Sequence, residues 1–289
     1  MTEKGRHGGK AMGRVTVQSL WIGARLSTME RLSIRSYLSL GHEFHLFTYG
    51  NVEGVPDGAA VRPAEDVLPA SDVFRYRRGP GRGSVSAFSN CFRYRLLLER
   101  GGWWTDLDSV CVRPLDFADE HVLGRERSPE GGTLIGSGLI KAPAGSALME
   151  YCWRASREAD RSRLRWGEIG PLLLSRAVGA VGAEVTVLEP EAFFPIDFWR
   201  VWELVLEGEV PDGCHAVHLW HSQWRLHALD PDAAYDPGCI YERLKRRSGV
   251  SSPPGAVRGP TRTARALRLL RWWKARLLGS APGPGPQRP

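Results

Sequence analysis

Two aspartates separated by one residue, Asp106 and Asp108, are the side chains whose type and spacing best suit chemistry. They lie in segment 103–112, WWTDLDSVCV, where alternating aromatic and β-branched residues predict a strand. Residues two apart on a strand share a face, so we expect both carboxylates to project together. Paired carboxylate oxygens suit Mg²⁺ or Mn²⁺, which would neutralise a diphosphate. An isolated D-x-D triplet, by contrast, is usually a strand end with two solvated acids.

A helix is expected directly before this strand. In FRYRLLLER, residues 92–100, apolar side chains recur at helical spacing while the charged ones can reach water. Gly101 and Gly102 follow and would end the helix. The helix, the glycine turn and the strand therefore form one unit that carries the aspartate pair.

The rest of the chain alternates between predicted strands and predicted helices, which is typical of an α/β sheet covered on both faces. Ser27 is a candidate N-cap for the first helix, and Gly170-Pro171 would open a later one. The predicted strands are 15–23, 42–50 and a pair within 132–143, and the predicted helices are 29–40 and 146–157.

Residues 89–108 carry the pattern SNxxRYxxLxxxGGWWxDLD. This pattern resembles the core of the DXD glycosyltransferases, the family of the yeast α-1,6-mannosyltransferases, the glucosylating toxins and the α-1,4-galactosyltransferases. These are retaining, metal-dependent enzymes that use nucleotide sugars. The resemblance implies a GT-A type nucleotide-sugar-binding fold, of class α/β, with a mixed, mainly parallel central sheet.

The same resemblance implies roles for individual side chains. Asp106 and Asp108 would be catalytic and would hold Mn²⁺ or Mg²⁺, with Asp106 also near the donor ribose and sugar. Arg93 and Trp104 would belong to the donor site, Arg93 at the sugar or diphosphate. Asn90 is a departure, because the family usually has Asp there; it can hydrogen-bond sugar hydroxyls but carries no charge. This departure leaves the donor sugar open.

The end of the first predicted strand reads Trp21-Ile22-Gly23. It resembles the first-strand motif of the glucosylating toxins, in which the tryptophan stacks on uracil. An aromatic face at a strand end is a suitable platform for a base, although a single tryptophan fits a plain core position equally well. The resemblance places all three residues in the donor site and implies a UDP-sugar.

Further candidates follow later in the chain. In CHAVHLWHSQWR, residues 214–225, either His218 or His221 could be a third metal ligand, since Mn²⁺ accepts imidazole beside carboxylates. The family ends its catalytic domain with a comparable histidine and a serine-tryptophan element, so Ser222 and Trp224 are candidates to close over the diphosphate. Glu168, just before Gly170-Pro171, is a candidate catalytic acid; a solvated loop glutamate is the plainer interpretation.

Length and composition indicate one catalytic domain with a tail. The chain has 289 residues, 42% of them hydrophobic and 25% charged, and no apolar run long enough to span a bilayer. We expect a disordered segment 1–14 without a signal peptide, a catalytic domain over 15–250, and a tail over 251–289. Five cysteines at no metal-like spacing indicate reduced thiols in a cytoplasm.

The positive charge is concentrated in the tail. The net charge is +7, and residues 253–289 contain eight basic residues and no acid, which leaves −1 for the remainder. Segment 261–278 is predicted to be an amphipathic helix with arginines on one side and leucine and tryptophan on the other, which suits an anionic membrane surface. Docking onto the catalytic domain is the alternative. Nucleic acid is not an expected partner, because the remainder is nearly neutral and shows no reading motif.

The sequence therefore supports one main functional hypothesis. The chain would be a metal-dependent retaining glycosyltransferase at the inner face of the cell membrane. It would move a hexose from a UDP-sugar to a glycan or lipid-linked acceptor in surface polysaccharide or glycolipid synthesis. A nucleotide-sugar hydrolase, or a catalytically silent nucleotide-sugar-binding or scaffold protein, are the alternatives.

Overall fold

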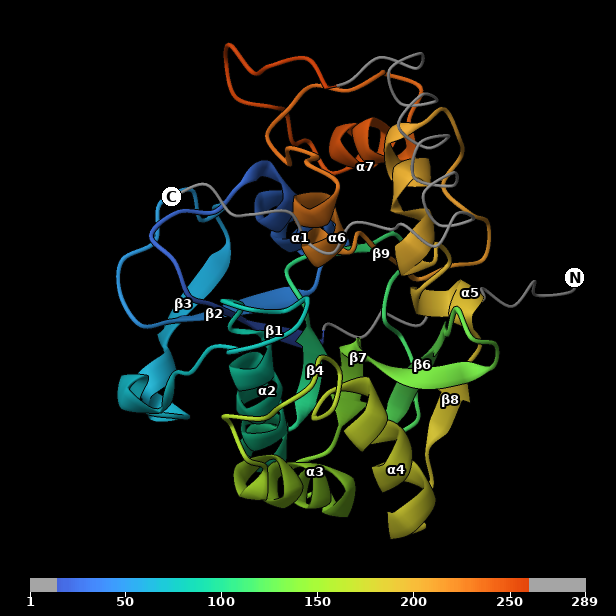
Figure 1. The fold of residues 1–289 in the computed structure, drawn as a ribbon. Coiled ribbons are helices and arrows are strands. Elements are labelled where there is room, and N and C mark those ends of the chain that lie inside the picture. The colour runs from blue at the N-terminus through green and yellow to red at the C-terminus, as the bar shows by residue number, and fades with distance from the viewer. Residues whose placement is uncertain (1–14, 260–289) are drawn as a thin grey trace, which may run out of the picture.

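A seven-stranded sheet forms the centre of the molecule, in the order β3-β2-β1-β4-β7-β6-β8 (Figure 1). The computed structural model describes residues 15–259, so the predictions for 1–14 and for the helix 261–278 lie outside the described residues. Every neighbouring pair of strands is parallel except the two pairs that contain β7. The predicted α/β class with a mixed, mainly parallel sheet is confirmed. The strands are β1 Thr16–Trp21, β2 Glu43–Thr48, β3 Ala59–Pro63, β4 Gly102–Thr105, β6 Val122–Arg127, β7 Thr133–Ala142 and β8 Thr186–Leu188.

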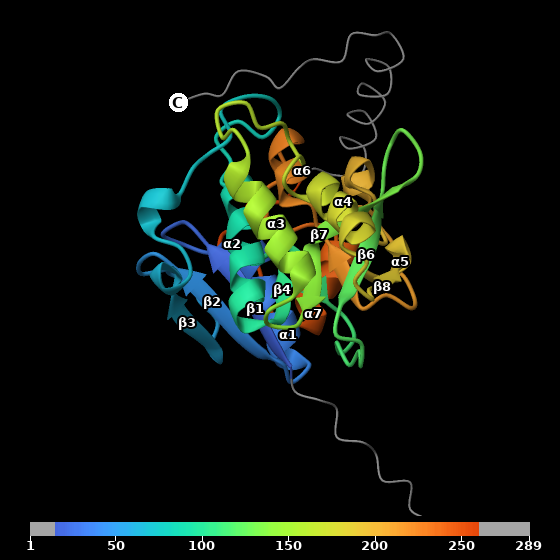
Figure 2. The ribbon, with the colours of Figure 1, turned by 90° about the horizontal axis from the view of Figure 1, so that it is seen from below.

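Helices cover both faces of this sheet. Figure 2 shows α2, α3 and α4 side by side over one face, and α1 lies on the other face with α7 packed against it. Trp103 and Trp104, consecutive on β4, point into the two different cores that result, and each is 1% exposed. The α-helices are α1 Thr28–Ser39, α2 Ser86–Arg100, α3 Ala147–Glu158, α4 Pro171–Val181, α5 Pro190–Phe193, α6 His221–Leu226 and α7 Ile240–Arg247, and the 3₁₀ segments are Ala64–Asp66, Ala70–Asp72 and Phe198–Val205.

The predicted strand over 103–112 is wrong in one respect, because the chain leaves the sheet at the aspartates. β4 ends at Thr105, and β5, Ser109–Cys111, belongs to a second, two-stranded sheet with β9, Ala216–His218. The backbone N–H of Ser109 donates to the carbonyl of Asp106 and closes the turn between them. The aspartate pair therefore lies in a connection between two sheets rather than within one strand.

Most other predicted elements are confirmed. Ser27 caps α1, with Glu30 completing a capping box, and Ser146 caps α3. The strand pair expected within 132–143 is wrong: it is the single strand β7, whose antiparallel partner is β6. All five cysteines are buried and free of disulfides. Within residues 15–259, no helix is both long and apolar enough to cross a membrane.

The Gly101 turn, which joins α2 to β4, depends on the absence of a side chain. Its φ is +65°, and a Cβ there would lie 2.5 Å from the backbone nitrogen of Ala144. We expect Gly101→Ala to lower the free energy of unfolding by about 2 kcal/mol or more, measured by urea titration. Gly179→Ala is the matched control, since its Cβ would meet nothing within 4 Å and alanine favours the α4 helix. Equal effects of the two changes would contradict this account.

Candidate functional site

Asp106, Asp108 and His218 form a cluster in which one ligand atom from each lies within 4.8 Å of the others. Asp106 follows the end of β4, Asp108 precedes β5, and His218 ends β9, where it is the register partner of Ser109. The two aspartates therefore project together, as expected, although a turn rather than a strand brings them together. Two carboxylates and one imidazole are a donor set that fits Mn²⁺ or Mg²⁺.

Asp106 is held by groups from three elements. The Arg93 guanidinium on α2 lies 2.9 Å from its Oδ1, and the indole N–H of Trp104 donates to the same oxygen at 3.0 Å. The backbone N–H of Asp106 donates to the carbonyl of Gly138 on β7 at 2.7 Å. Burial, with Asp108 as a like-charged neighbour, raises the pKa of Asp106, while the Arg93 cation opposes that rise.

This arrangement assigns positioning roles to two residues that were predicted to contact the donor. The Arg93 side chain is 3% exposed and also donates to the carbonyl of Ser137 and to Ser89. Trp104 is 1% exposed, with the Arg93 guanidinium 4.8 Å from its ring centre. Both side chains therefore lie beneath Asp106 and orient it.

Asp108 is fixed by the segment after β9. The backbone N–H of His221 donates to its Oδ2 at 2.8 Å, and that of Leu219 donates to its carbonyl at 2.6 Å. His218 Nε2 lies 3.4 Å from Oδ1 of Asp108, and His218 Nδ1 accepts from the backbone N–H of Trp220 at 3.2 Å. Metal coordination through Nε2 needs the tautomer with its proton on Nδ1, so it would replace the contact between Nδ1 and the Trp220 N–H.

Three residues predicted at the end of the catalytic domain are placed differently from one another. The imidazole of His221 lies 3.6 Å from Glu30 and outside the cluster, and its role as a metal ligand stays a prediction. Trp224 is fully buried and donates to the carbonyl of Leu219, so it packs in the core instead of closing over a diphosphate. Ser222 is half-buried in α6. The reason is a left-handed turn at Trp220, after which α6 begins and redirects these side chains.

The Trp21-Ile22-Gly23 segment lies at the carboxyl end of β1, the strand beside β4. Trp21 is half-buried, and its ring packs on Gly23, where a Cβ would lie 3.0 Å from the indole nitrogen. That nitrogen has no hydrogen-bond partner among residues 15–259. The segment lies on the β3 side of the aspartates, and its contact with a base stays a prediction.

Asn90 and Glu168 lie near the start of α4. Asn90 is 6% exposed, and its Oδ1 is buried without a partner in the described part of the chain. A Cβ on Gly170 would lie 3.0 Å from the Asn90 amide nitrogen, so the two residues are packed together. The Glu168 carboxylate accepts from the backbone N–H of Arg165 at 2.9 Å and is not part of the aspartate cluster.

The structure adds Glu126, which the sequence analysis did not select. It lies on β6 within Arg125-Glu126-Arg127, where strand alternation alone would have turned it to the face opposite its neighbours. Burial, with the charge of Asp106, raises the pKa of Glu126 to about 7. The sequence feature that could have identified Glu126 is its position between two arginines, Arg125 and Arg127, on a strand.

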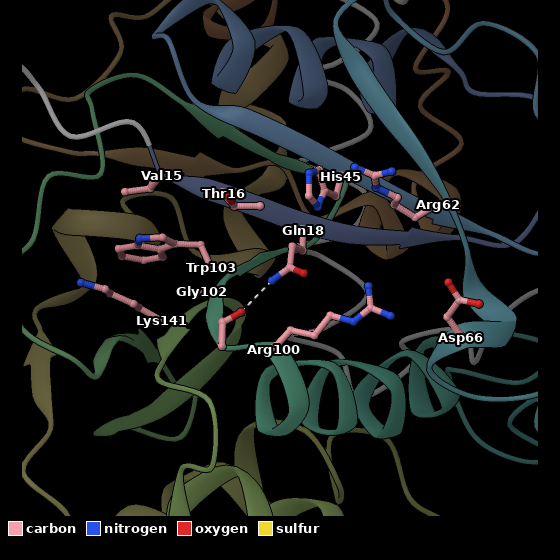
Figure 3. A pocket seen from close by; sticks show the side chains of 11 residues that line it. Val15, Thr16, Gln18, His45, Arg62, Asp66, Arg100, Gly102, Trp103 and Lys141 are labelled. Atoms are coloured by element: carbon pink, nitrogen blue, oxygen red, sulfur yellow. Dashed lines mark hydrogen bonds between the residues drawn. The ribbon is translucent and has the colours of Figure 1, made fainter.

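A separate cavity of about 650 Å³ lies at the opposite end of the strands (Figure 3). It is bounded by the start of β1 and β4 and by the last residue of α2, Arg100, whereas the aspartates follow the carboxyl end of β4. It is therefore not part of the candidate site. Its polar lining includes Gln18, His45, Arg62, Asp66, Arg100 and Lys141.

Comparison with known proteins adds little to this geometry. No family model matches the chain, and no curated protein matches it in sequence. Among solved structures, the PaToxG glycosyltransferase is similar with a TM-score of 0.44 and 15% identity, over 57% of this chain and 68% of that chain. At that level of similarity, the neighbour's activity cannot be transferred to this chain.

The first prediction from the site concerns the Arg93–Asp106 pair. Arg93→Met leaves the Asp106 carboxylate without its cation, so we expect a loss of about 2–4 kcal/mol in the free energy of unfolding. Arg95→Met on the same helix is the control, because Arg95 forms a half-exposed pair with Glu99 and should cost about 1 kcal/mol or less. Urea titration without added metal measures both. Similar losses would show that the pair does not stabilise the fold.

The second prediction concerns pH. Because the pKa of Glu126 is raised above its unfolded value, the folded state resists ionisation, and stability falls as pH rises from about 4.5 to about 7. We expect Glu126→Gln to raise the melting temperature at pH 8 and to have little effect at pH 5. Glu189→Gln, at a carboxylate that is 74% exposed, is the control and should change neither. A Glu126→Gln effect that is the same at both pH values would contradict the raised pKa.

Proposed function

We propose that this protein is a metal-dependent glycosyltransferase that moves a hexose from a nucleotide sugar to an acceptor hydroxyl. The observation that carries the proposal is the Asp106, Asp108 and His218 cluster at the carboxyl end of β4. Ligand sites in α/β sheets form outside the carboxyl ends of the strands, and oxygen ligands there suit a cation that holds a diphosphate. The strand order and the D-x-D sequence agree with a GT-A type enzyme.

The finer proposal follows from the resemblance of residues 89–108 and of the Trp21-Ile22-Gly23 segment. We infer a UDP-hexose donor with its base at the end of β1, and retention of the anomeric configuration. The acceptor would be a glycan or a lipid-linked sugar, in surface polysaccharide or glycolipid synthesis. Attachment to the inner membrane face is proposed for segment 261–278 from its sequence alone.

The residues of the site would have two kinds of role, metal binding and positioning. A bound divalent ion would act as a Lewis acid that stabilises the departing nucleoside diphosphate. Asp106 and Asp108 would supply its oxygen ligands, and the Arg93 guanidinium with the Trp104 indole would keep Asp106 oriented toward it. His221 and Leu219 hold Asp108 through their backbone N–H groups, so the second carboxylate is oriented before any ligand binds.

The test is calorimetric titration of UDP into the full chain with Mn²⁺ and with excess chelator. We expect binding that requires Mn²⁺ and that weakens at least about 100-fold in Asp108→Asn, because one of two charged ligands is lost. Glu158→Gln, at an exposed residue at the end of α3, is the control and should bind as the unaltered chain does.

Two results would count against the proposal. UDP affinity that is the same with excess chelator as with Mn²⁺ would show that donor binding does not depend on a metal. Absence of binding by both UDP and GDP would favour the scaffold alternative. Release of free hexose in the presence of varied sugar acceptors, with no glycoside formed, would favour the hydrolase.

A further inference from the structure

We propose that Glu126 is a catalytic residue on the acceptor side of the site, where its carboxylate binds the attacking hydroxyl and takes its proton. This inference rests on the proposed glycosyltransferase function. It concerns a residue outside the metal cluster, and it assigns the acceptor to the β6 and β7 side of the aspartates.

Glu126 and the metal cluster lie on the same face of β7. Glu126 is the register partner of Leu134, and the pairing shifts register between Arg125–Ile135 and Leu123–Ile140, so the Cβ directions of Gly136 and Gly138 show which groups face this part of β7. Oε2 of Glu126 lies 3.1 Å from the position of a Cβ on Gly136, and Oδ2 of Asp106 lies 3.4 Å from that of Gly138. Positions two apart on a strand are roughly 7 Å from each other. Glu126 is thus one strand repeat away from the cluster.

The two glycines let aromatic rings pack closely on the β7 backbone between these acids. A Cβ on Gly136 would lie 2.5 Å from the ring of Phe194, and one on Gly138 would lie 2.7 Å from Nε2 of His218. The Phe194 and His218 rings, 5.4 Å apart, therefore pack directly on the bare strand. Together they line the face that connects Glu126 to the aspartates.

The strand order indicates which substrate Glu126 meets. β1, with Trp21 at its end, and β6, with Glu126, lie on opposite sides of β4. A nucleotide whose base rests at the end of β1 and whose diphosphate lies at the aspartates extends its sugar toward β7 and β6. Because the configuration is proposed to be retained, the acceptor hydroxyl must approach the anomeric carbon on the side of the departing diphosphate, and Glu126, on the β6 side of the aspartates, is placed to bind it there.

The charged neighbours leave Glu126 available for a substrate. No hydrogen bond or ion pair joins its carboxylate to any residue within 15–259. The arginines beside it are already engaged, Arg125 with Glu189 and Arg127 with Glu191 and Asp197. A carboxyl group whose pKa is about 7 is also well matched to accepting a proton at neutral pH.

The acceptor oxygen forms a bond to the anomeric carbon of the donor hexose on the face from which the diphosphate leaves, and the acceptor O–H proton moves to the Glu126 carboxylate. The bond between that carbon and the phosphate oxygen breaks, and its electron pair leaves with the nucleoside diphosphate. Glu126 then returns the proton to water, so the net products are a glycoside, the nucleoside diphosphate and one proton.

The experiment compares the full chain with Glu126→Gln, Glu126→Asp and the control Glu189→Gln in Mn²⁺. UDP release is measured from UDP-glucose, UDP-galactose and UDP-N-acetylglucosamine, with water and with methyl glucoside or methyl galactoside as acceptor. UDP affinity and melting temperature are measured on the same samples. We expect Glu126→Gln to slow turnover by about 10²- to 10⁴-fold with UDP affinity changed less than about twofold. Glu126→Asp, or added formate, should restore part of the rate, and Glu189→Gln should equal the unaltered chain.

Two outcomes would overturn the assignment: turnover by Glu126→Gln at the unaltered rate, or UDP affinity that falls in parallel with turnover, which would make Glu126 a donor-binding residue. Failure of the unaltered chain to bind UDP or GDP is a different result, because it rejects the proposed function itself. Loss of turnover with retained nucleotide binding supports the proposal specifically.

Discussion

The ion pair between Arg93 and Asp106 is the contact on which the candidate site depends. It joins the middle of α2 to the residue after β4, and the same guanidinium reaches the carbonyl of Ser137 on β7. The Asp106 side chain is 27% exposed and the Arg93 side chain 3%, so the arginine above all would be costly to leave unpaired. The pair therefore ties the helix, the parallel part of the sheet and its antiparallel strand to one geometry, and Asp106 keeps its orientation without a ligand.

The second constraint is the break in the chain after β4. Thr105 is the last residue of the large sheet, and the carboxylates that follow are oriented by a small sheet built from β5 and β9. Since β9 comes more than 100 residues later, the cluster exists only when segments 105–111 and 216–218 are both folded. Backbone N–H groups of Leu219 and His221 complete this arrangement at Asp108, so the site needs no large rearrangement to present two carboxylates together.

The site also concentrates charge that the fold does not fully compensate. Burial raises the pKa of both Asp106 and Glu126, and within residues 15–259 Asp106 has a cationic partner whereas Glu126 has none. Acids held in this state reduce stability near neutral pH, and such a cost is common where a site is arranged for a ligand. The glycines of β7 belong to the same arrangement, because side chains at Gly136 or Gly138 would collide with Phe194 and His218.

Local patterns in the sequence were sufficient for the α/β class, for the helix and glycine turn before the aspartates, and for Ser27 as the cap of α1. Periodicity and caps act over a few residues, so they can be recognised without knowing what packs against them. The aspartate pair and His218 were identifiable by residue type, and the structure brings these three together.

Tertiary structure alone decided what the other side chains do. Arg93 and Trp104 turn beneath Asp106, Trp224 enters the core, and His221 faces Glu30, because each orientation depends on strands and helices distant in sequence. Glu126 could not be selected from the sequence for the same reason. Its place on the face that holds the aspartates depends on the pairing of β6 with β7. Sequence determined which chemical groups are available, and long-range packing determined which of them meet.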